Sequence, residues 1–397
     1  MKMLPGVGLF GYGSLARAKI SLLQAVGFKV EAVWAPTMEL AKEIATDMNI
    51  PFYTNRVDDV LLNHNVDLVC ISNPPIMHSQ VAVKALGIGK HVMCEKPAGL
   101  NEIDAFKMVN AARYYPTLMS IMGHGLRFLP AFSRMKTLVR DGYVGVVQLC
   151  EIRVHCGSII KEKYNWECDE GMGGGTLSVI GSHMIDIITY LINQKAIKVQ
   201  GRLKTLVEQT AKINGIRRIT SDDFCTFQME LDGGAFATIT LNSHCSGVFS
   251  QELLIVGTKG RLAVREADLY GQSSGMTKEE IIVADSLLIS EQQRLGVSDA
   301  VLKELPLPYF KGVLKLICAL KDAFERREDK LSWDSEPVSM AATFEDGLYV
   351  QAVIDGVRRS NQTGLWEMVA MLTEEPDANP YLTSAAVHRS RHSFTFT

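Results

Sequence analysis

A glycine-rich turn near the start of the chain has the residue types and spacing of a phosphate-binding loop. The apolar stretch 6–10 leads into Gly11-Tyr12-Gly13-Ser14-Leu15-Ala16, a GxGxxA pattern, and a helical stretch follows. Gly11 allows a tight turn, Gly13 lets the backbone approach a pyrophosphate, and Ala16 lets the helix pack closely on the strand. The first N–H groups of the helix then meet the phosphates. We predict a dinucleotide site at residues 11–16; the alternative is an incidental tight turn.

Two later apolar stretches, 67–72 and 91–94, end in residues suited to cofactor binding and acid–base chemistry. Ser72-Asn73-Pro74-Pro75-Ile76-Met77-His78 follows the first, and Cys94-Glu95-Lys96-Pro97 ends the second. Loops at the carboxyl ends of parallel strands face the ligand crevice. We therefore expect cofactor contacts from Asn73, Pro74, His78, Glu95 and Lys96. Lys96 is also a candidate acid or base if burial lowers its pKa from about 10.4; the alternative is a surface turn.

The third element is a glycine run, Gly173-Gly174-Gly175, that introduces an apolar helix predicted over 176–191. Helical spacing places Val179, His183 and Asp186 on one face of this helix. The alternative reading is a pair of core side chains bonded to each other. His183 and Asp186 show no metal-ligand spacing with any cysteine, and the chain has no CxxC pair, so we predict no metal site.

The first 123 residues alternate strands and helices, which predicts a parallel sheet with right-handed crossovers. Strands are expected at 6–10, 29–34, 67–72 and 91–94, and helices at 14–25, 38–48 and 79–86. An acid at the end of the second strand would favour NAD, and an arginine NADP. The sequence there is Trp34-Ala35-Pro36, with neither, so the choice between NAD and NADP stays open. Trp34 either stacks on adenine or belongs to the core.

After residue 123 the pattern changes to strands with one polar face. Segments 146–155, 198–207, 223–231, 235–243 and 251–256 predict an open, mainly antiparallel sheet with one face towards solvent or a partner subunit. Residues 271–310 are expected to be an irregular surface excursion, and 339–359 an amphipathic helix. The predicted fold class is α/β, a doubly wound Rossmann sheet followed by this second domain. The predicted divisions are 1–123, 124–334, 335–370 for a helix packing back on the first domain, and a tail, 371–397.

Composition narrows the classes of protein. The chain has 397 residues, 47% hydrophobic and 21% charged, and a formal net charge of -3, typical of a soluble globule without affinity for nucleic acid or anionic membranes. Its eight cysteines are expected to be free thiols in a reducing compartment, which favours the cytoplasm. The apolar N-terminal stretch resembles a weak secretion signal, but we interpret it as the nucleotide-binding strand. The apolar stretch 176–192 contains His183 and Asp186, which favours a core helix over a membrane span.

Together these motifs resemble the Gfo/Idh/MocA oxidoreductase family, over nearly the whole chain. Glu95-Lys96-Pro97 after Gly89-Lys90-His91-Val92 is the most specific part of the resemblance. The segments 127–132, 219–225 and 372–376 are most similar to the animal glucose–fructose oxidoreductase domain-containing proteins. The resemblance implies NAD or NADP as cofactor and a carbinol carbon of a sugar, cyclitol or dihydrodiol as the reacting centre. It also implies a dimer or higher homo-oligomer through the second sheet, with Lys96 and His183 as catalytic residues.

One position departs from the family pattern. Many of its dehydrogenases carry Asp four residues before the motif histidine, where this chain has Val179, so the Asp–His–Lys relay is incomplete. Asp186, Asp169 and Glu170 are candidates to replace it. The candidate substrate-lining residues are Arg127, His155, Tyr164, Trp166 and Asp186, because aromatic rings pack on sugars and Arg binds hydroxyls or carboxylates.

Three functions remain open at this stage. The first is an NAD(P)-dependent oxidoreductase for a polyhydroxylated small molecule. The second is a glycosidase with a tightly held NAD, which would turn over sugar without net change in NADH. The third is a non-catalytic dinucleotide-binding protein that acts through partners. Val179 favours the third, while the presence of both Lys96 and His183 favours the first.

Overall fold

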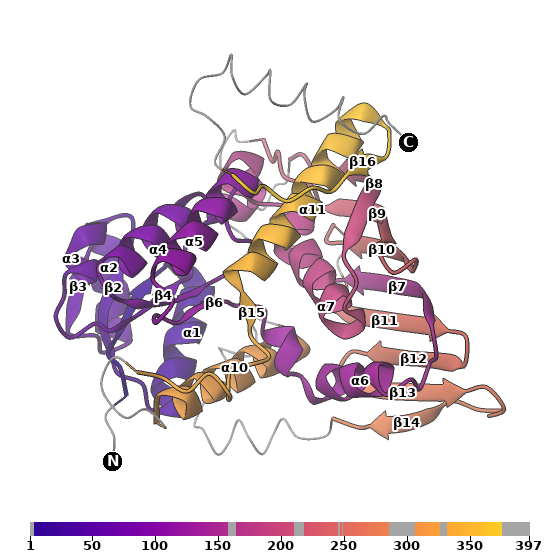
Figure 1. Ribbon diagram of the computed structural model, residues 1–397. Coiled ribbons are helices and arrows are strands. Elements are labelled where there is room, and N and C mark those ends of the chain that lie inside the picture. Colours follow the sequence, from indigo (N-terminus) through magenta and orange to yellow (C-terminus); the bar gives the residue numbers. More distant parts are fainter. Residues whose placement is uncertain are drawn as a thin grey trace.

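The computed structural model of this chain describes residues 4–157, 164–209, 218–244, 247, 249–285, 306–325 and 332–374. Two sheets organise these residues (Figure 1): a seven-stranded sheet A formed mainly by the N-terminal part, and a nine-stranded sheet B formed by the later part. The predicted fold class is confirmed.

The cysteine and metal predictions can be compared with the structure over these described residues. The seven cysteines among them are free thiols, and no group of three or more His, Cys, Asp or Glu there could hold a metal.

Sheet A is parallel except at one edge. Its strand order is β15-β6-β5-β4-β1-β2-β3. The parallel strands are β1 (Val7–Phe10), β2 (Val30–Trp34), β3 (Phe52–Thr54), β4 (Leu68–Ile71), β5 (His91–Cys94) and β6 (Ser120–Met122), and the antiparallel edge strand is β15 (Ala342–Thr343). The central strands β1, β4 and β5 are buried along their whole length. Such continuous apolar runs are typical of a parallel sheet covered on both faces.

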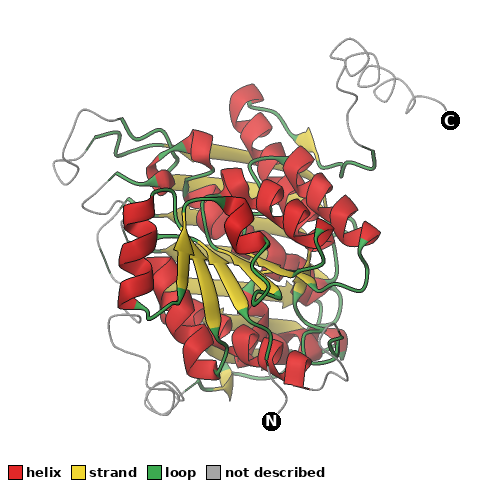
Figure 2. Ribbon diagram, turned by 90° about the vertical axis from the view of Figure 1, so that its left-hand side faces the viewer, coloured by secondary structure: helices red, strands yellow, loops and turns green. Residues whose placement is uncertain are grey.

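Helices cover both faces of sheet A (Figure 2). One face packs against α1 (Gly13–Val26), α2 (Met38–Asp47) and α10 (Leu307–Glu325). The other packs against α3 (Val57–Leu61), α4 (His78–Gly87) and α5 (Glu102–Tyr114). Helix α10 was not predicted, and its first residues lie in the stretch 271–310 that was expected to be irregular. Its residues Phe310, Ile317 and Phe324 are fully buried in this core, so a segment of the predicted second domain completes the first. Residues 286–305 of that stretch and 375–397 of the predicted tail lie outside the described residues.

Sheet B has the strand order β14-β13-β12-β11-β7-β10-β9-β8-β16. Its strands are β7 (Val147–His155), β8 (Ala196–Lys204), β9 (Phe224–Leu231), β10 (Phe236–Asn242), β11 (Ser250–Gly257), β12 (Gly260–Arg265), β13 (Asp268–Ser273), β14 (Glu280–Val283) and β16 (Glu367–Met368). All neighbours are antiparallel except β7 and β10. Buried and partly exposed residues alternate along β10, as expected for a sheet with one covered face. The strands β12, β13 and β14 were not predicted.

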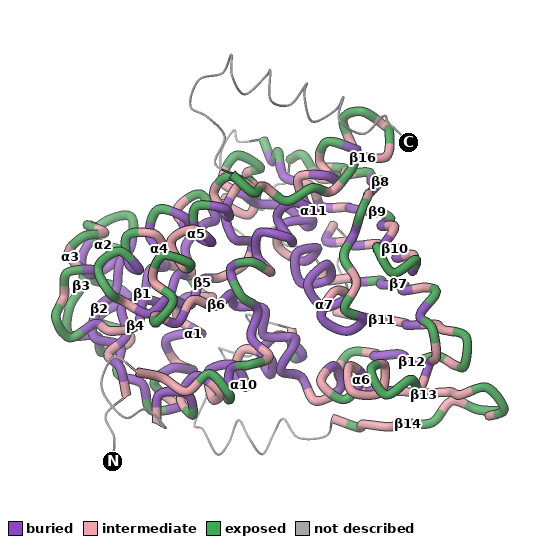
Figure 3. Tube along the Cα trace, in the orientation of Figure 1, coloured by how far each residue is buried: buried purple, intermediate pink, exposed green. Residues whose placement is uncertain are grey.

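Helices α6 (Pro130–Arg140) and α7 (Ser182–Ile192) cover the inner face of sheet B, and α7 is buried almost throughout (Figure 3). The predicted single helix over 176–191 is instead a π-helical turn, Leu177–Gly181, followed by α7. The stretch Glu170–Ile192 is long and apolar enough to cross a membrane, but 83% of its most apolar window is buried in the protein, as in a core helix.

Helix α11 (Phe344–Thr363) lies between the two sheets and contacts both α5 and β8 (Figure 1). It begins five residues later than the predicted 339, because Ala342 and Thr343 pair with β6 as strand β15. The Thr343 side chain then caps the helix by accepting a hydrogen bond from the Asp346 N–H, while the Asp346 carboxylate accepts one from the Thr343 N–H.

Candidate active site

Strand register brings the three predicted loops to one edge of sheet A. Phe10 of β1 pairs with Ile71 of β4, and Ile71 pairs with Cys94 of β5. The residues that follow these strands are joined to their neighbours by backbone hydrogen bonds: Ser72 N–H donates to Phe10, and Glu95 N–H donates to Ile71. The glycine turn, the loop after β4 and the loop after β5 therefore begin side by side.

The glycine turn has the shape that a bound pyrophosphate requires. Gly13 has φ +82°, and a Cβ added there would meet no atom within 4 Å, so the space beside it is open. A Cβ on Gly11 would lie 2.9 Å from the Ser72 carbonyl oxygen, which explains why this position is a glycine. Helix α1 begins without a side-chain cap, so its first N–H groups are not bonded by a capping side chain. The turn fits a dinucleotide.

Trp34 is a core residue in this structure. Its side chain is 5% exposed, and its ring stacks on Phe10 with 6.0 Å between centroids. Of the two alternatives left open by the sequence, burial supports the core and gives no support to stacking on adenine. After β2, Thr37 accepts a hydrogen bond from the Leu40 N–H and caps α2, and the first acid is Glu39 in the first turn.

We expect NAD and NADP to bind with similar affinity, because no acid in residues 35–38 would repel a 2′-phosphate and no arginine there would attract it. The two dissociation constants should differ by less than about tenfold, or ~1.4 kcal/mol. Calorimetric titration with NADH and NADPH measures both. A thousandfold preference for either cofactor would contradict this account of the β2 loop.

His78 connects two of the loops. Its Nδ1 lies 2.8 Å from the Pro97 carbonyl oxygen and its Nε2 lies 2.7 Å from that of Asn73, and the ring is fully buried. Burial lowers the pKa of His78, and the two carbonyls oppose this effect. His78, predicted as a cofactor contact, is therefore better described as a residue that holds the loops after β4 and β5 together. By contrast, the buried Asn73 side-chain amide and the Ser72 hydroxyl have no hydrogen-bond partner in the structure.

Glu95 forms a largely buried ion pair that the sequence did not reveal. Its carboxylate accepts a hydrogen bond from Lys19 of α1, whose side chain is only 3% exposed. Burial by itself would raise the pKa of Glu95, but the charges of Lys19 and Lys96 together lower it below its ordinary value. A Cβ on Gly123 would lie 2.9 Å from the same carboxylate, so the loop after β6 packs directly against it. Glu95 therefore ties α1, β5 and β6 together beneath Lys96.

We expect Lys19→Met to lower the free energy of unfolding by about 3–5 kcal/mol at neutral pH, because it leaves a buried carboxylate without its partner. The folded-state pKa of Glu95 is depressed, so the pair stabilises the protein above pH 4.5, the ordinary value, and loses its effect as the pH falls through the folded pKa. Denaturant unfolding measured from neutral to acid pH checks both statements.

The exposed pair Lys84–Asp58 supplies the control, since both side chains are about half exposed, at 44% and 58%. Lys84→Met should cost no more than about 1 kcal/mol. Equal costs for the two substitutions would show that the Lys19–Glu95 pair is not the buried support described here.

Lys96 reaches across to the second domain. Its Nζ donates a hydrogen bond of 2.6 Å to the Val179 carbonyl oxygen in the π-helical turn before α7. Such turns are frequent at functional sites. Burial lowers the pKa of Lys96, while the carboxylates of Glu95 and Glu167 partly oppose this effect. Lys96 is therefore an amine with a lowered pKa at the edge where the dinucleotide turn ends, which is what a general base requires.

His183 lies buried beside two residues that sequence analysis did not select. Its ring packs edge-on against His124, with 5.5 Å between centroids, and against Tyr309 of α10, with 4.9 Å. Burial, followed by the charges of Lys96 and His124, holds the pKa of His183 well below its ordinary value, so the ring is neutral near pH 7. Its Nδ1 is buried and has no hydrogen-bond partner.

Arg127 and Asp186 bind each other rather than facing an open pocket. Arg127 Nε donates to Asp186 Oδ2 at 2.9 Å, and Nη1 donates to Asp346 Oδ2 at 3.2 Å. Asp186 is fully buried, and its other neighbour is Nδ1 of His124 at 3.8 Å. Asp186 is therefore not paired with His183. The Asp169 carboxylate is also engaged, as it accepts a hydrogen bond from Gly171 N–H.

The remaining predicted substrate residues are placed apart. Alternate residues of a strand lie on the same face of its sheet. His155 is therefore on the same face of β7 as Glu151 and Arg153, the outer face of sheet B, away from α7. The structure gives no support to a place for it in the site. Tyr164 packs on the small cluster of Cys168 and Ile219, and Trp166 is half-buried at the start of a short 3₁₀ turn. Their contact with substrate stays a prediction.

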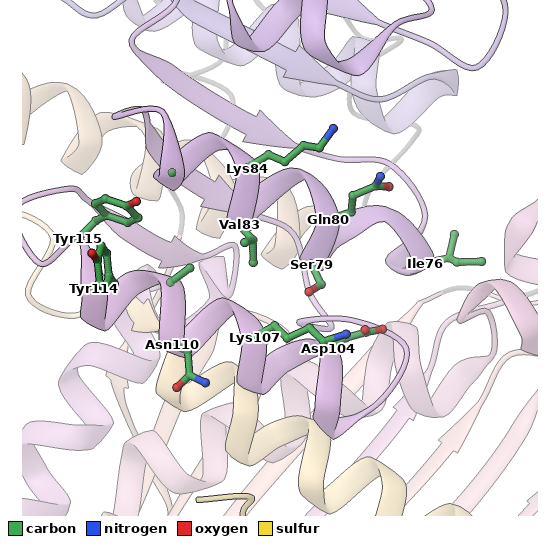
Figure 4. A pocket seen from close by; sticks show the side chains of 12 residues that line it. Ile76, Ser79, Gln80, Val83, Lys84, Asp104, Lys107, Asn110, Tyr114 and Tyr115 are labelled. Carbon is green, nitrogen blue, oxygen red and sulfur yellow. The ribbon is translucent and has the colours of Figure 1, made fainter. Parts of the chain in front are cut away.

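A groove of about 690 Å³ lies between α4 and α5 (Figure 4), but it is separate from this site. Its lining includes Ile76, Ser79 and Lys107 and extends to Tyr114 and Tyr115 at the end of α5. None of the predicted catalytic or cofactor-binding residues lines it.

Comparison with known proteins agrees with the geometry. The family model of an oxidoreductase family with an NAD-binding Rossmann fold matches residues 6–122, and the model of the GFO/IDH/MocA C-terminal domain matches residues 132–263. The chain belongs to the Gfo/Idh/MocA oxidoreductase family. It is 51% identical to glucose-fructose oxidoreductase domain-containing protein 1 of Xenopus tropicalis, over 98% of this chain and 99% of that protein. It is 52% identical to human glucose-fructose oxidoreductase domain-containing protein 2, over 97% of this chain and 98% of that protein.

Solved structures of more distant proteins share the fold. An oxidoreductase domain protein from Kribbella flavida superposes with a TM-score of 0.76 at 22% identity, over 93% of this chain and 100% of that one. A levoglucosan dehydrogenase in complex with NADH and L-sorbose superposes with a TM-score of 0.74 at 17% identity, over 93% of this chain and 100% of that one. An aldose-aldose oxidoreductase from Caulobacter crescentus, complexed with glycerol, superposes with a TM-score of 0.69 at 21% identity, over 92% of this chain and 99% of that one.

Proposed function

We propose that this protein is an NAD(P)-dependent oxidoreductase that acts on a carbinol carbon of a sugar, cyclitol or dihydrodiol-like molecule. The observation that carries the proposal is Lys96: a partly buried amine of lowered pKa that follows β5, with only β4 between β5 and the strand before the glycine turn, and that hydrogen-bonds to the second domain. The levoglucosan dehydrogenase with NADH and the aldose-aldose oxidoreductase, which share this fold, support the choice of chemistry.

The residues that would hold the dinucleotide are those with open space or unpartnered polar atoms at this edge. The glycine turn 11–16 and the N-terminus of α1 would hold the pyrophosphate, and the unpartnered polar side chains of Ser72 and Asn73 lie in the neighbouring loop after β4. A bound nicotinamide supplies the hydride acceptor or donor that interconverts an alcohol and a carbonyl.

Lys96 and His183 would handle the proton. Neutral Lys96 takes the proton of the substrate hydroxyl as the carbinol carbon is oxidised, and it returns a proton in the reverse direction. His183, neutral at physiological pH, accepts a hydrogen bond from a neighbouring hydroxyl of the polyhydroxylated substrate. While no substrate is bound, the Val179 carbonyl holds Lys96 in position.

A screen tests the proposal. The purified protein is incubated with NAD or NADP and a panel of sugars, cyclitols and dihydrodiols, and reduced cofactor and products are both quantified. We expect reduced cofactor to form in a one-to-one ratio with a carbonyl product. Cleavage of a glycosidic bond without net cofactor reduction would indicate the glycosidase instead.

One observation favours a second candidate, a non-catalytic dinucleotide-binding protein. Val179 contributes a backbone carbonyl where many relatives carry an aspartate, so Lys96 is held by a neutral group rather than a carboxylate. Tight binding of NADH or NADPH in calorimetry, with no turnover across the panel, would select this candidate.

We also propose that two copies associate through the outer face of sheet B. No described helix covers this face (Figure 1), and Arg153 lies on it between Thr240 and Glu252 of the neighbouring strands. These residues line a hollow of about 350 Å³. We expect light scattering to give a mass of about twice 43.8 kDa, and Arg153→Glu to shift it towards one copy. A monomer at micromolar concentration, or an equal shift for Lys84→Glu on α4, would contradict this proposal.

A further inference from the structure

The buried surroundings of His183 contain an imidazole that no step above uses. His124 follows β6, its side chain is 1% exposed, and neither ring nitrogen has a hydrogen-bond partner. Two elements fix its place. Gly123 packs on the Glu95 carboxylate, and Gly125 packs backbone to backbone on Gly312, where a Cβ would lie 2.6 Å from the Gly125 carbonyl oxygen.

One side of His124 faces a carboxylate of fixed orientation. Arg127 holds both oxygens of Asp186, and Oδ2 of that carboxylate lies 3.8 Å from Nδ1 of His124. A neutral imidazole has one N–H and one lone pair. The negative charge of Asp186 favours the tautomer of His124 with the proton on Nδ1, which leaves a lone pair on Nε2.

The other side of His124 faces His183. Their ring centroids are 5.5 Å apart and their planes are nearly perpendicular, at 86°. A hydrogen bond of about 3 Å between two ring nitrogens places the ring centres roughly 5 Å apart. The observed separation is slightly larger than this, so the two rings lie close together without being hydrogen-bonded in the structure, and each has a buried nitrogen without a partner.

We propose that His124, oriented by Asp186, is a positioning residue that accepts a hydrogen bond from Nδ1–H of His183. This contact fixes His183 with Nε2 unprotonated. It explains why Asp186 is buried one turn from His183 without touching it: the carboxylate acts through the second imidazole. The role of His183 in turnover rests on the proposed function, but the tautomer does not.

Solid-state NMR of the full-length protein labelled with ¹⁵N-histidine tests the proposal, since protonated and unprotonated ring nitrogens have well-separated shifts. His183→Asn identifies the signals of His183 among the nine histidines. We expect Nδ1 of His183 to be protonated and Nε2 bare in the wild type. His124→Gln keeps an acceptor near the position of Nε2 and should preserve this state, whereas His124→Phe should convert His183 to the Nε2–H tautomer.

Tyr309→Phe is the matched control. It keeps the second ring that packs on His183 and removes only a hydroxyl that donates to Gln251, so the His183 tautomer should not change. An Nε2–H tautomer in the wild type, or an unchanged Nδ1–H tautomer in a folded His124→Phe variant, would overturn the inference.

Kinetics separate this inference from the proposed function. If the protein turns over a polyol, His124→Phe should lower kcat roughly tenfold, as expected for loss of an orienting partner, with cofactor affinity unchanged. His124→Gln should restore most of that loss. The predicted tautomers without any turnover would support the inference and contradict the oxidoreductase proposal.

Discussion

Replacing Lys96 with methionine is expected to lower turnover by at least ~100-fold, the low end for loss of a general base. Methionine keeps most of the volume of the side chain but can neither accept a proton nor donate to the Val179 carbonyl. Affinity for NADH should remain nearly intact, because the pyrophosphate contacts come from the glycine turn. Steady-state kinetics and calorimetry on the same preparation measure the two quantities.

Lys107→Met on the exposed face of α5 controls for removal of a surface charge. It should change neither turnover nor affinity. If Lys96→Met retains wild-type turnover, Lys96 is not the base and the proposed mechanism fails.

Replacing Gly13 with valine is expected to abolish dinucleotide binding, weakening it by at least about 100-fold, or ~2.7 kcal/mol. The side chain would occupy the open space beside the turn, where the pyrophosphate approaches. Calorimetric titration with NADH and NADPH measures the loss.

Gly142 offers a matched control, because it has the same φ of +82° and its Cβ would also meet nothing within 4 Å. Gly142→Val therefore carries the same backbone strain outside the site, and we expect it to bind NADH normally. Unchanged affinity in a folded Gly13→Val variant would show that the dinucleotide does not bind at this turn.

The parts of the site that could be predicted from the sequence are those set by local pattern. The glycine turn, the Lys96 loop and the helix that carries His183 each follow from a few adjacent residues. Their meeting at one edge follows from the parallel strands between them. The same reasoning predicted both sheets. A continuous apolar run indicates a strand of a buried parallel sheet, whereas alternating apolar and polar residues indicate a strand with one exposed face, and the two patterns can be told apart within one strand.

The residues that were missed depend on contacts between distant segments. Lys19 reaches Glu95 across 76 positions, and a lysine on the apolar side of the predicted helix 14–25 was its only signal. His124 follows β6, a strand too short to be predicted. Tyr309 lies in α10, inside a stretch interpreted as irregular. Arg127 and Asp186 were predicted as substrate-lining residues, and their mutual ion pair could be seen only in the fold.

The pH dependence of kcat/KM, compared between the wild type and Lys96→Met, shows whether Lys96 is the general base. Lys96 acts only when neutral, so the rate should rise with pH through a single pKa below the ordinary lysine value of about 10.4. Because partial burial lowers the pKa of Lys96, that rise should occur at a lower pH than for a free lysine. We expect this rise in the wild type, and we expect it to disappear, together with most of the rate, in Lys96→Met. The same rise in both proteins, or no turnover in the wild type across the substrate panel, would contradict this role of Lys96.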